Sequence, residues 1–252
     1  MTDYQHYDFN TTLKIAISRG DSEGNYPKYQ EWINACESNV ELTNLYGMLP
    51  KNAELLLEKC SGLLLSGGND IHPYHYKKPK KEDKCKSIDD KRDTLEFLLI
   101  LKALSLNMPI LGICRGMQML NVVMDGNLIT DIPSEISTTI IHQKENDQKD
   151  NCFHEINILP NSLLHAITNQ ETLIVNSYHH QAIDHCSDIL KVTAKSQDGI
   201  VETIEWKHPE ERPFLLGVQW HPERMENYDI YSLGIAAAFI DAARDYNGRL
   251  QK

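Results

Sequence analysis

The sequence predicts an α/β fold in which a mostly parallel sheet carries helices on both faces. In the first half of the 252-residue chain, short apolar runs alternate with helical patterns, and such strand–helix–strand units form parallel sheets. Two of the runs, 62–66 and 110–113, are almost entirely apolar, as expected for strands buried on both faces. The C-terminal half is richer in short strand patterns, so we expect additional strands there.

Each expected element follows from its apolar spacing. Apolar runs predict strands at 14–18, 40–45, 62–66, 110–113, 155–159, 173–176, 190–194, 200–205 and 215–220. Helical spacing predicts helices at 28–37, 53–59, 89–106, 116–124 and 230–245. The polar segments 77–87 and 143–152 are expected to be loops. No repeat or break in composition divides the chain, so we expect one domain over 1–252 with its core at about 13–246.

Composition and charge exclude several classes of function. Apolar residues make up 41% of the chain and charged residues 24%, which is typical of globular proteins. The net charge of −11 argues against nucleic acid binding, and the basic run 77–86 is interrupted by Glu82 and Asp83, which favours a solvated loop. No stretch approaches the roughly 20 apolar residues that cross a bilayer, and residues 1–10 lack a signal core. We therefore expect a cytoplasmic protein with no nucleic acid or membrane partner.

One of the six cysteines stands in an unusual pattern. The six are scattered without a C-x-x-C pair, and five of them fit small apolar residues or surface thiols. Cys114 instead lies between a buried strand and a helix, flanked by Gly112 and Gly116. Gly-x-Cys-x-Gly at such a turn is the nucleophile-elbow arrangement with Cys in place of Ser. The glycines permit the sharp turn, which projects the sulfur from the carboxyl end of the sheet.

The position of Cys114 at a helix N-terminus has two expected consequences. The partial positive charge there favours the thiolate, and the backbone N–H of Arg115 would point at a developing oxyanion. The alternative is a buried structural cysteine between two incidental glycines, and the motif with its strand and helix leaves both interpretations open.

His221 and Glu223 are the expected partners of the thiol. His221 ends a predicted strand, and residues two apart in an extended chain share a face, so both side chains can point the same way. The carboxylate would then fix the imidazole tautomer, as Asp does in a serine triad. A strand-end histidine that caps its own backbone is the alternative. In a similar way, Gly67 and Gly68 follow a buried strand and could supply a second oxyanion donor, or form a simple tight turn.

The polar run 176–181, Asn-Ser-Tyr-His-His-Gln, follows another predicted strand. A metal site that joins His179 and His180 to His72 and His75 is conceivable. However, adjacent residues of an extended segment face opposite sides, and no standard metal-ligand spacing occurs. We therefore expect no metal, and assign the run to a wall of the substrate site.

Four blocks of sequence resemble the class I glutamine amidotransferase-like superfamily, and most closely its γ-glutamyl-γ-aminobutyrate hydrolase branch. The blocks are Leu-Leu-Ser-Gly-Gly-Asn-Asp-Ile-His-Pro at 64–73 with Tyr76, Pro-Ile-Leu-Gly-Ile-Cys-Arg-Gly-Met-Gln-Met-Leu-Asn at 109–121, Val-Asn-Ser-Tyr-His-His-Gln-Ala at 175–182, and Gly-Val-Gln-Trp-His-Pro-Glu at 217–223. Any one block is suggestive, whereas all four in order are highly specific. Their order and spacing cover nearly the whole chain.

The resemblance implies a flavodoxin-like, doubly wound α/β core and a catalytic triad of Cys114, His221 and Glu223. It implies oxyanion donors at the backbone of Gly68 and Arg115, and no cofactor. By analogy, the substrate-binding residues expected from these blocks are Gly67, Asn69, Gln118, Ser177, His179 and His180. Two departures from the branch pattern leave the triad unchanged. Asp125-Gly126 stands where many members have Gly-Gly, and the loop 77–86 is rich in lysine, which bears on substrate specificity.

The expected activity is hydrolysis of a γ-glutamyl amide, such as γ-glutamyl-γ-aminobutyrate, through a γ-glutamyl thioester on Cys114. Several leaving amines fit the pattern equally, and a homodimer is compatible with it. One alternative is a glutaminase that delivers ammonia to a separate synthetase. The other is a non-catalytic binding protein on the same scaffold, although such proteins usually lack a triad member.

Overall fold

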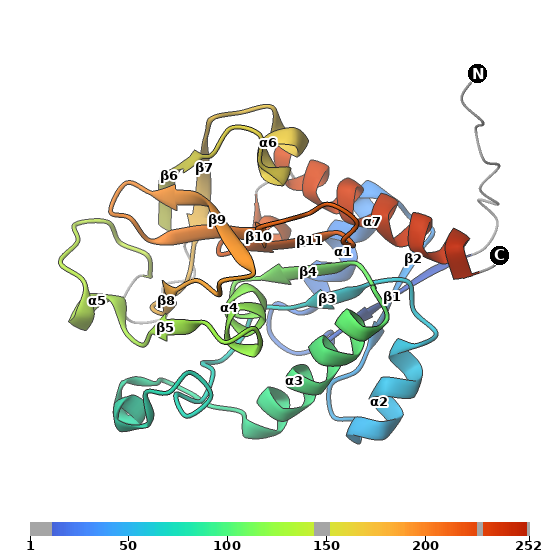
Figure 1. The fold of residues 1–252 in the computed structure, drawn as a ribbon, viewed down its shortest axis with the longest axis horizontal. Helices are drawn as coiled ribbons and strands as arrows, with labels where there is room; N and C mark the ends of the chain where they lie inside the picture. The colour runs from blue at the N-terminus through green and yellow to red at the C-terminus, as the bar shows by residue number, and fades with distance from the viewer. Residues whose placement is uncertain (1–11, 144–151, 226–228, 251–252) are drawn as a thin grey trace.

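A nine-stranded sheet runs through the molecule, with its first five strands parallel and the others antiparallel (Figure 1). The computed structural model describes residues 12–143, 152–225 and 229–250. The strand order is β2-β1-β3-β4-β11-β10-β9-β6-β7. The strands are β1 Leu13–Ile17, β2 Val40–Asn44, β3 Leu63–Leu65, β4 Ile110–Ile113, β6 Cys152–Ile158, β7 Thr172–Ser177, β9 Leu190–Ser196, β10 Val201–Trp206 and β11 Leu215–Val218. The predicted α/β architecture with added strands in the C-terminal half is confirmed.

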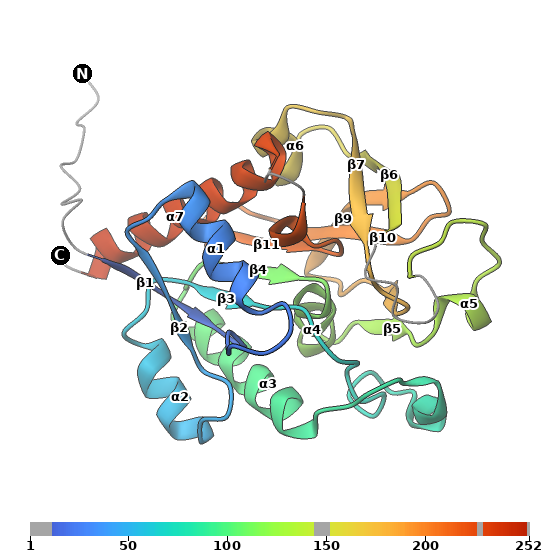
Figure 2. The same cartoon turned by 180° about the vertical axis from the view of Figure 1, so that it is seen from behind.

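Helices cover both faces of the sheet and enclose two hydrophobic cores (Figure 2). One face carries α1 (Pro27–Cys36), α6 (Leu163–Thr168) and α7 (Ile230–Leu250), and the other carries α2 (Pro50–Leu57), α3 (Asp90–Ser105) and α4 (Arg115–Val123). On the first face the fully buried Trp32 donates its indole N–H to Ser232 Oγ at 2.9 Å, which ties α1 to α7. Among the described helices, none combines the length and apolar character needed to cross a bilayer.

Several short elements were not predicted from the sequence. Strands β5 (Asn127–Ile129) and β8 (Ala182–His185) form a separate two-stranded sheet, and α5 (Ile132–Glu135) and α6 are single short helices. Each has too few residues for a periodic apolar pattern, and β5 and β8 pair with each other from positions far apart in the chain. The helix predicted at 53–59 begins earlier, at Pro50, because proline at the first helical position is already set for the helix.

The lysine-rich segment 77–86 is more ordered than the predicted solvated loop. It contains a short 3-10 helix, Pro79–Lys84, and its lysines contact acidic groups. Lys77 binds Asp125 at 2.6 Å and Lys78 binds Asp184 at 2.9 Å. The first pair is well exposed and contributes little stability, but both place the segment against β5 and β8. Of the other predicted loop, residues 144–151 lie outside the described residues, and 152 begins β6.

Candidate active site

Three neighbouring parallel strands end at one edge of the sheet and bring the predicted catalytic segments together. In the register, Gly112 of β4 lies between Leu65 of β3 and Gly217 of β11. The N–H of Cys114 still donates a hydrogen bond to the carbonyl of Val218 in β11 at 2.7 Å, so the chain leaves the sheet directly after the cysteine. Ligands of open α/β sheets bind at this carboxyl edge. Residues from positions 67, 114 and 221 therefore meet at the usual location of a functional site.

The cysteine occupies a strained turn. Cys114 has φ 51° and ψ −106°, in the left-handed region that a residue with a side chain rarely adopts, and α4 starts directly after it. A Cβ on Gly112 would lie 2.8 Å from the backbone of Gly116, and one on Gly116 would collide with the Leu65 carbonyl. Only glycine fits at both positions, which is the expected geometry of a nucleophile elbow.

The imidazole of His221 is held on two sides. Its Nδ1 lies 2.7 Å from Glu223 Oε1, and both side chains are buried. The side chain of Asn176 clamps the backbone of His221, accepting from its N–H at 2.8 Å and donating to its carbonyl at 2.7 Å. Glu223 fixes Nδ1 as the protonated nitrogen and leaves Nε2 for another group.

The predicted reason for the His221–Glu223 pairing was wrong, although the two side chains do meet. Strand β11 ends at Val218, and residues Pro222–Arg224 form a 3-10 helix rather than extended chain. The ring and the carboxylate come together because this tight turn folds Glu223 back under the imidazole. Ser232 holds the turn in place by donating to the Pro222 carbonyl at 2.7 Å.

The sulfur and the imidazole flank the same glycine. A Cβ placed on Gly67 would lie 2.8 Å from His221 Cε1 and 3.6 Å from Cys114 Cβ. The side chains of positions 114 and 221 therefore share one small volume, although 107 residues of sequence separate them. Any larger residue at position 67 would push them apart, which explains the glycine there.

Electrostatics place the proton on the sulfur in the resting protein. Burial raises the pKa of the Cys114 thiol to about 12, even though the nearby Arg224 and the Arg115 N–H act to lower it. The N–H of Arg115 at the helix N-terminus acts in the expected direction, towards the thiolate, but burial has the larger effect. Burial and the positive charge of Arg224 lower the pKa of His221, so its imidazole is neutral at pH 7.

The Gly67–Gly68 peptide is oriented by a buried arginine. Arg92 donates from Nη2 to the carbonyls of Ser66 and Gly67, each at 2.9 Å. Because a trans peptide points its N–H opposite to its carbonyl, the Gly68 N–H faces away from Arg92. Within the described residues this N–H donates no hydrogen bond, and Gly68 is exposed. Its φ of 148° and the proximity of Arg92 leave no room for a side chain.

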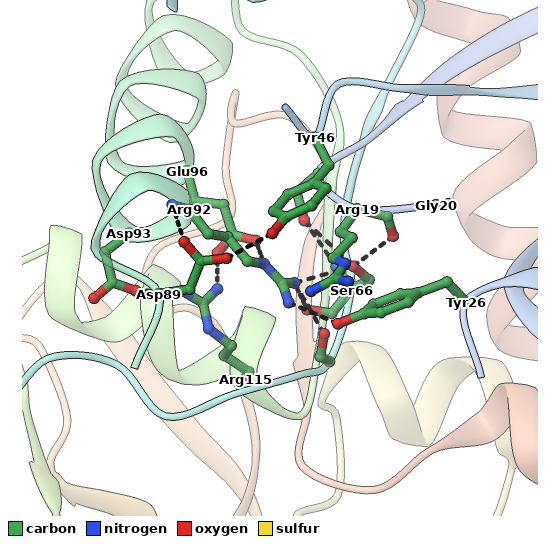
Figure 3. Close-up of polar contacts among 12 residues, drawn as sticks. Arg19, Gly20, Tyr26, Tyr46, Ser66, Asp89, Arg92, Asp93, Glu96 and Arg115 are labelled. Carbon is green, nitrogen blue, oxygen red and sulfur yellow. Dashed lines mark hydrogen bonds and ion pairs between the residues drawn. The ribbon is translucent and has the colours of Figure 1, made fainter. Parts of the chain in front are cut away.

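The side chain of Arg115 lies in a network of buried charges (Figure 3). Arg115 contacts both Asp93 and Glu96 of α3, and Arg92 Nε binds Glu96 Oε1 at 2.8 Å. All four charged side chains are buried. Glu96 thus contacts both Arg92, which orients the Gly67–Gly68 peptide, and Arg115, which follows Cys114 in the chain. The sequence did not reveal this arrangement, because its members are ordinary helix residues by spacing.

A glutamine that sequence analysis missed contacts the sulfur. Gln219 of the segment after β11 donates from Nε2 to Cys114 Sγ at 3.5 Å. The predicted substrate residue Gln118 donates instead to Gln219 Oε1 at 3.1 Å and to the Gln181 carbonyl at 3.0 Å. Gln118 therefore reaches the sulfur through Gln219. A strand-end glutamine two residues before His221 was the only signal for this role.

The other predicted substrate residues are occupied by protein contacts. The N–H of Gly67 donates to Tyr29 Oη at 2.8 Å, and Asn69 donates to Ser87 Oγ at 3.1 Å. The buried Ser177 donates to the His142 carbonyl at 2.8 Å. These contacts shape the surrounding loops, and direct substrate binding by the three residues stays a prediction.

The two adjacent histidines of the polar run face different neighbours. His180 uses both ring nitrogens on carboxylates, at 3.1 Å from Asp131 and 2.9 Å from Asp70. His179 points the other way, and its Nδ1 contacts the Gln181 carbonyl at 2.9 Å. A cavity of about 610 Å³ borders both histidines, but Cys114, His221 and Glu223 are not among the described residues that line it.

The sequence profile of the peptidase C26 family matches residues 28–223, which include the cysteine, the histidine and the glutamate described above. This chain is a member of the peptidase C26 family. The family belongs to the class I glutamine amidotransferase-like proteins. All three strand ends that build the site of this peptidase C26 protein lie inside the matched region.

Of two relatives of this peptidase C26 protein, one has a name that states no activity and the other is named for an enzymatic activity. It is 39% identical to protein NtpR of Enterococcus hirae over 76% of this chain and 78% of that protein. It is 32% identical to the gamma-glutamyl-gamma-aminobutyrate hydrolase PuuD of Escherichia coli K12 over 81% of this chain and 80% of that enzyme.

Solved structures agree on the fold. The glutaminase domain of Trypanosoma brucei CTPS, solved with bound acivicin, superposes with a TM-score of 0.65 at 18% identity. The superposition covers 93% of this chain and 94% of that domain. At this identity the likeness concerns the fold alone, and it confirms the predicted glutamine amidotransferase-like architecture.

Proposed function

We propose that this protein hydrolyses γ-glutamyl amides with Cys114 as nucleophile, His221 as general base and acid, and Glu223 as the group that orients the imidazole. The observation that carries the proposal is the placement of the cysteine and the imidazole around Gly67, with Glu223 at 2.7 Å from His221. The relative PuuD, which is named for this activity, supports the choice of substrate class.

The first half-reaction begins with a proton transfer. Because the thiol is protonated and the imidazole neutral, His221 takes the proton from Cys114 as the sulfur attacks the γ-carbonyl carbon. The carbonyl oxygen becomes an oxyanion, for which we assign the N–H groups of Gly68 and Arg115 as donors. The amide C–N bond then breaks, His221 gives its proton to the leaving amine, and a γ-glutamyl thioester forms on Cys114.

The second half-reaction consumes water. His221 accepts a proton from a water molecule that attacks the thioester carbonyl, and the same N–H groups hold the second oxyanion. The C–S bond breaks, glutamate leaves, and the proton returns to the sulfur. Although burial alone would raise the pKa of Glu223, His221 and Arg224 lower it, so this carboxylate is ionised and stabilises the imidazolium in both steps.

A panel of γ-glutamyl amides tests the substrate class. Glutamate release is measured for γ-glutamyl-γ-aminobutyrate, other γ-glutamyl amines, γ-glutamyl peptides and free glutamine, with the matching α-glutamyl amides as controls. We expect γ-linked compounds to be cleaved and α-linked ones to be inert. Cleavage of free glutamine alone would favour the ammonia-delivering glutaminase instead, and no turnover of any γ-glutamyl compound would contradict the proposal.

Arg224 is expected to set the pH range of activity. Burial and the charge of Arg224 lower the pKa of His221 below the usual value near 6.5, so the acidic limb of the kcat/KM profile should lie below pH 6.5. In Arg224→Gln the imidazolium is no longer repelled, the pKa of His221 rises, and the acidic limb should move to higher pH. Arg212→Gln, at the opposite end of β11, is the matched control. An unchanged or downward-shifted limb in Arg224→Gln would contradict this role.

A further inference from the structure

Three histidines and a glutamate from four separate segments meet in the antiparallel half of the molecule. They are His142, His154, His179 and Glu202, named here the histidine cluster. One ring nitrogen of His142, one of His154 and one carboxylate oxygen of Glu202 lie within 4.8 Å of one another. The ring of His179 packs 4.9 Å from that of His142, and its Nε2 is 3.9 Å from Glu202 Oε1. The members are buried, with exposed fractions of 8% or less.

Each histidine of the cluster is anchored through one nitrogen. His142 Nε2 lies 2.9 Å from Asp198, His154 Nε2 lies 2.8 Å from Glu202, and His179 Nδ1 lies 2.9 Å from the Gln181 carbonyl. Carboxylates and carbonyls only accept, so the hydrogen-bond network places the proton of each neutral ring on these nitrogens. The second nitrogen of every ring therefore carries a lone pair.

These second nitrogens are buried without a donor. His142 Nδ1, His154 Nδ1 and His179 Nε2 have no hydrogen-bond partner in the described structure, and neither has Glu202 Oε2. Leaving a buried acceptor unsatisfied is costly, and four such acceptors in one cluster offer their lone pairs to a cation.

We propose that the histidine cluster binds one divalent transition-metal ion of the zinc type, at a site separate from the triad. Three imidazoles and a carboxylate form a nitrogen-rich ligand set that suits zinc and its first-row neighbours rather than calcium or magnesium. The ligand atoms of a tetrahedral ion with bonds of about 2.1 Å lie roughly 3.4 Å apart. The ligand atoms of His142, His154 and Glu202 now lie within 4.8 Å of one another and His179 Nε2 lies 3.9 Å from Glu202 Oε1, so the side chains have to move closer together to bind one ion.

The surroundings of the cluster support this assignment. Metal-bound histidines usually donate their other ring nitrogen to a carboxylate or carbonyl, as His142 does to Asp198 and His179 does to the Gln181 carbonyl. The hydrogen bond between His154 and Glu202 joins two members of the cluster and has to be exchanged for bonds to the ion. Asp198, which holds His142, is itself held by Thr138 at 2.6 Å and Ser196 at 2.5 Å. The 610 Å³ cavity, lined by His142 and His179, provides a route for an ion to enter.

This inference revises the expectation of no metal. The sequence argument considered histidines near one another in the chain, and the adjacent His179 and His180 do face different sides. The cluster instead takes only His179 from that run and adds two histidines and a glutamate from other segments. The known sequence spacings of metal ligands do not describe four residues that come from separate segments of the chain.

Metal binding can be measured without any assay of activity. The full chain, freed of metal with a chelator, is titrated with Zn²⁺ by calorimetry, and Co²⁺ is added in parallel for visible spectroscopy. We expect one equivalent of Zn²⁺ to bind with a Kd of about 10⁻⁷ M or tighter, and to raise the unfolding temperature. Bound Co²⁺ should show d–d bands without a thiolate charge-transfer band, because the ligands are nitrogen and oxygen.

Three variants locate the site. His142→Gln and Glu202→Gln should each weaken Zn²⁺ binding at least about tenfold, whereas Cys114→Ala, which removes the only thiol of the triad, should bind as the parent does. Exposed His208→Gln is the matched control for a lost histidine. Because His142 lies outside the helices and strands, its variant is expected to keep the fold, as checked by circular dichroism. Absence of stoichiometric binding, or binding that is lost in Cys114→Ala and kept in His142→Gln, would overturn the proposal.

Discussion

Cys114→Ala is expected to lower the rate of glutamate release from a γ-glutamyl amide by about 10⁴-fold or more, because removal of a nucleophile disables the whole catalytic unit. The thioester cannot form without the sulfur, and neither His221 nor the oxyanion donors can replace it. The fold should survive, since alanine adopts the same backbone conformation as cysteine and leaves only a small cavity beside Gly67.

The measurement is steady-state release of glutamate by parent and variant, with circular dichroism and the unfolding temperature as checks of the fold. Cys186→Ala, which removes a half-buried cysteine next to β8, is the matched control and should keep the parental rate. Turnover by Cys114→Ala at the parental rate would refute the proposed nucleophile. Tight binding of γ-glutamyl compounds without turnover by the parent would instead support a binding protein on this scaffold.

Glu96→Gln should destabilise the protein by about 3–5 kcal/mol, the usual cost of breaking a buried ion pair by removing one partner. Glu96 is fully buried between Arg92 and Arg115, and the variant leaves both guanidinium groups with one fewer anion in the interior. Among the described residues, Asp93 would then be the one carboxylate still ion-paired with either arginine (Figure 3). The loss is expected in the free energy of unfolding measured with urea.

The exposed Asp90→Asn on the same helix is the matched control, with an expected change of about 0.5 kcal/mol or less. The effect of Glu96→Gln should also depend on pH. Burial alone would raise the pKa of Glu96, but Arg115 and Arg92 lower it, so its contribution to stability is present above the unfolded value near 4.5 and is lost as the pH falls through the folded value. A difference between parent and variant that is below about 1 kcal/mol at pH 7, or that grows on acidification, would contradict the role assigned to the network.

Local sequence determined the parallel core and the cysteine elbow. The apolar runs at β3 and β4 are buried because they are uniformly apolar, and helices α1 to α4 follow from periodic spacing. The turn at Cys114 was predictable because glycines two residues on either side are a local steric requirement. The order of strand ends then places His221 at the same edge of the sheet as the sulfur.

Tertiary structure alone decided how the site is held and how its groups are charged. Three features join residues that are distant in the chain. They are the hydrogen bond from Gln219 to the sulfur, the hydrogen bond from Arg92 to the Gly67 carbonyl, and the contacts within the histidine cluster. The pKa of Cys114 likewise depends on burial, which outweighs the local effect of the helix N-terminus. Periodicity and motifs describe neighbours in sequence, whereas desolvation and long-range hydrogen bonds exist only after the chain has folded.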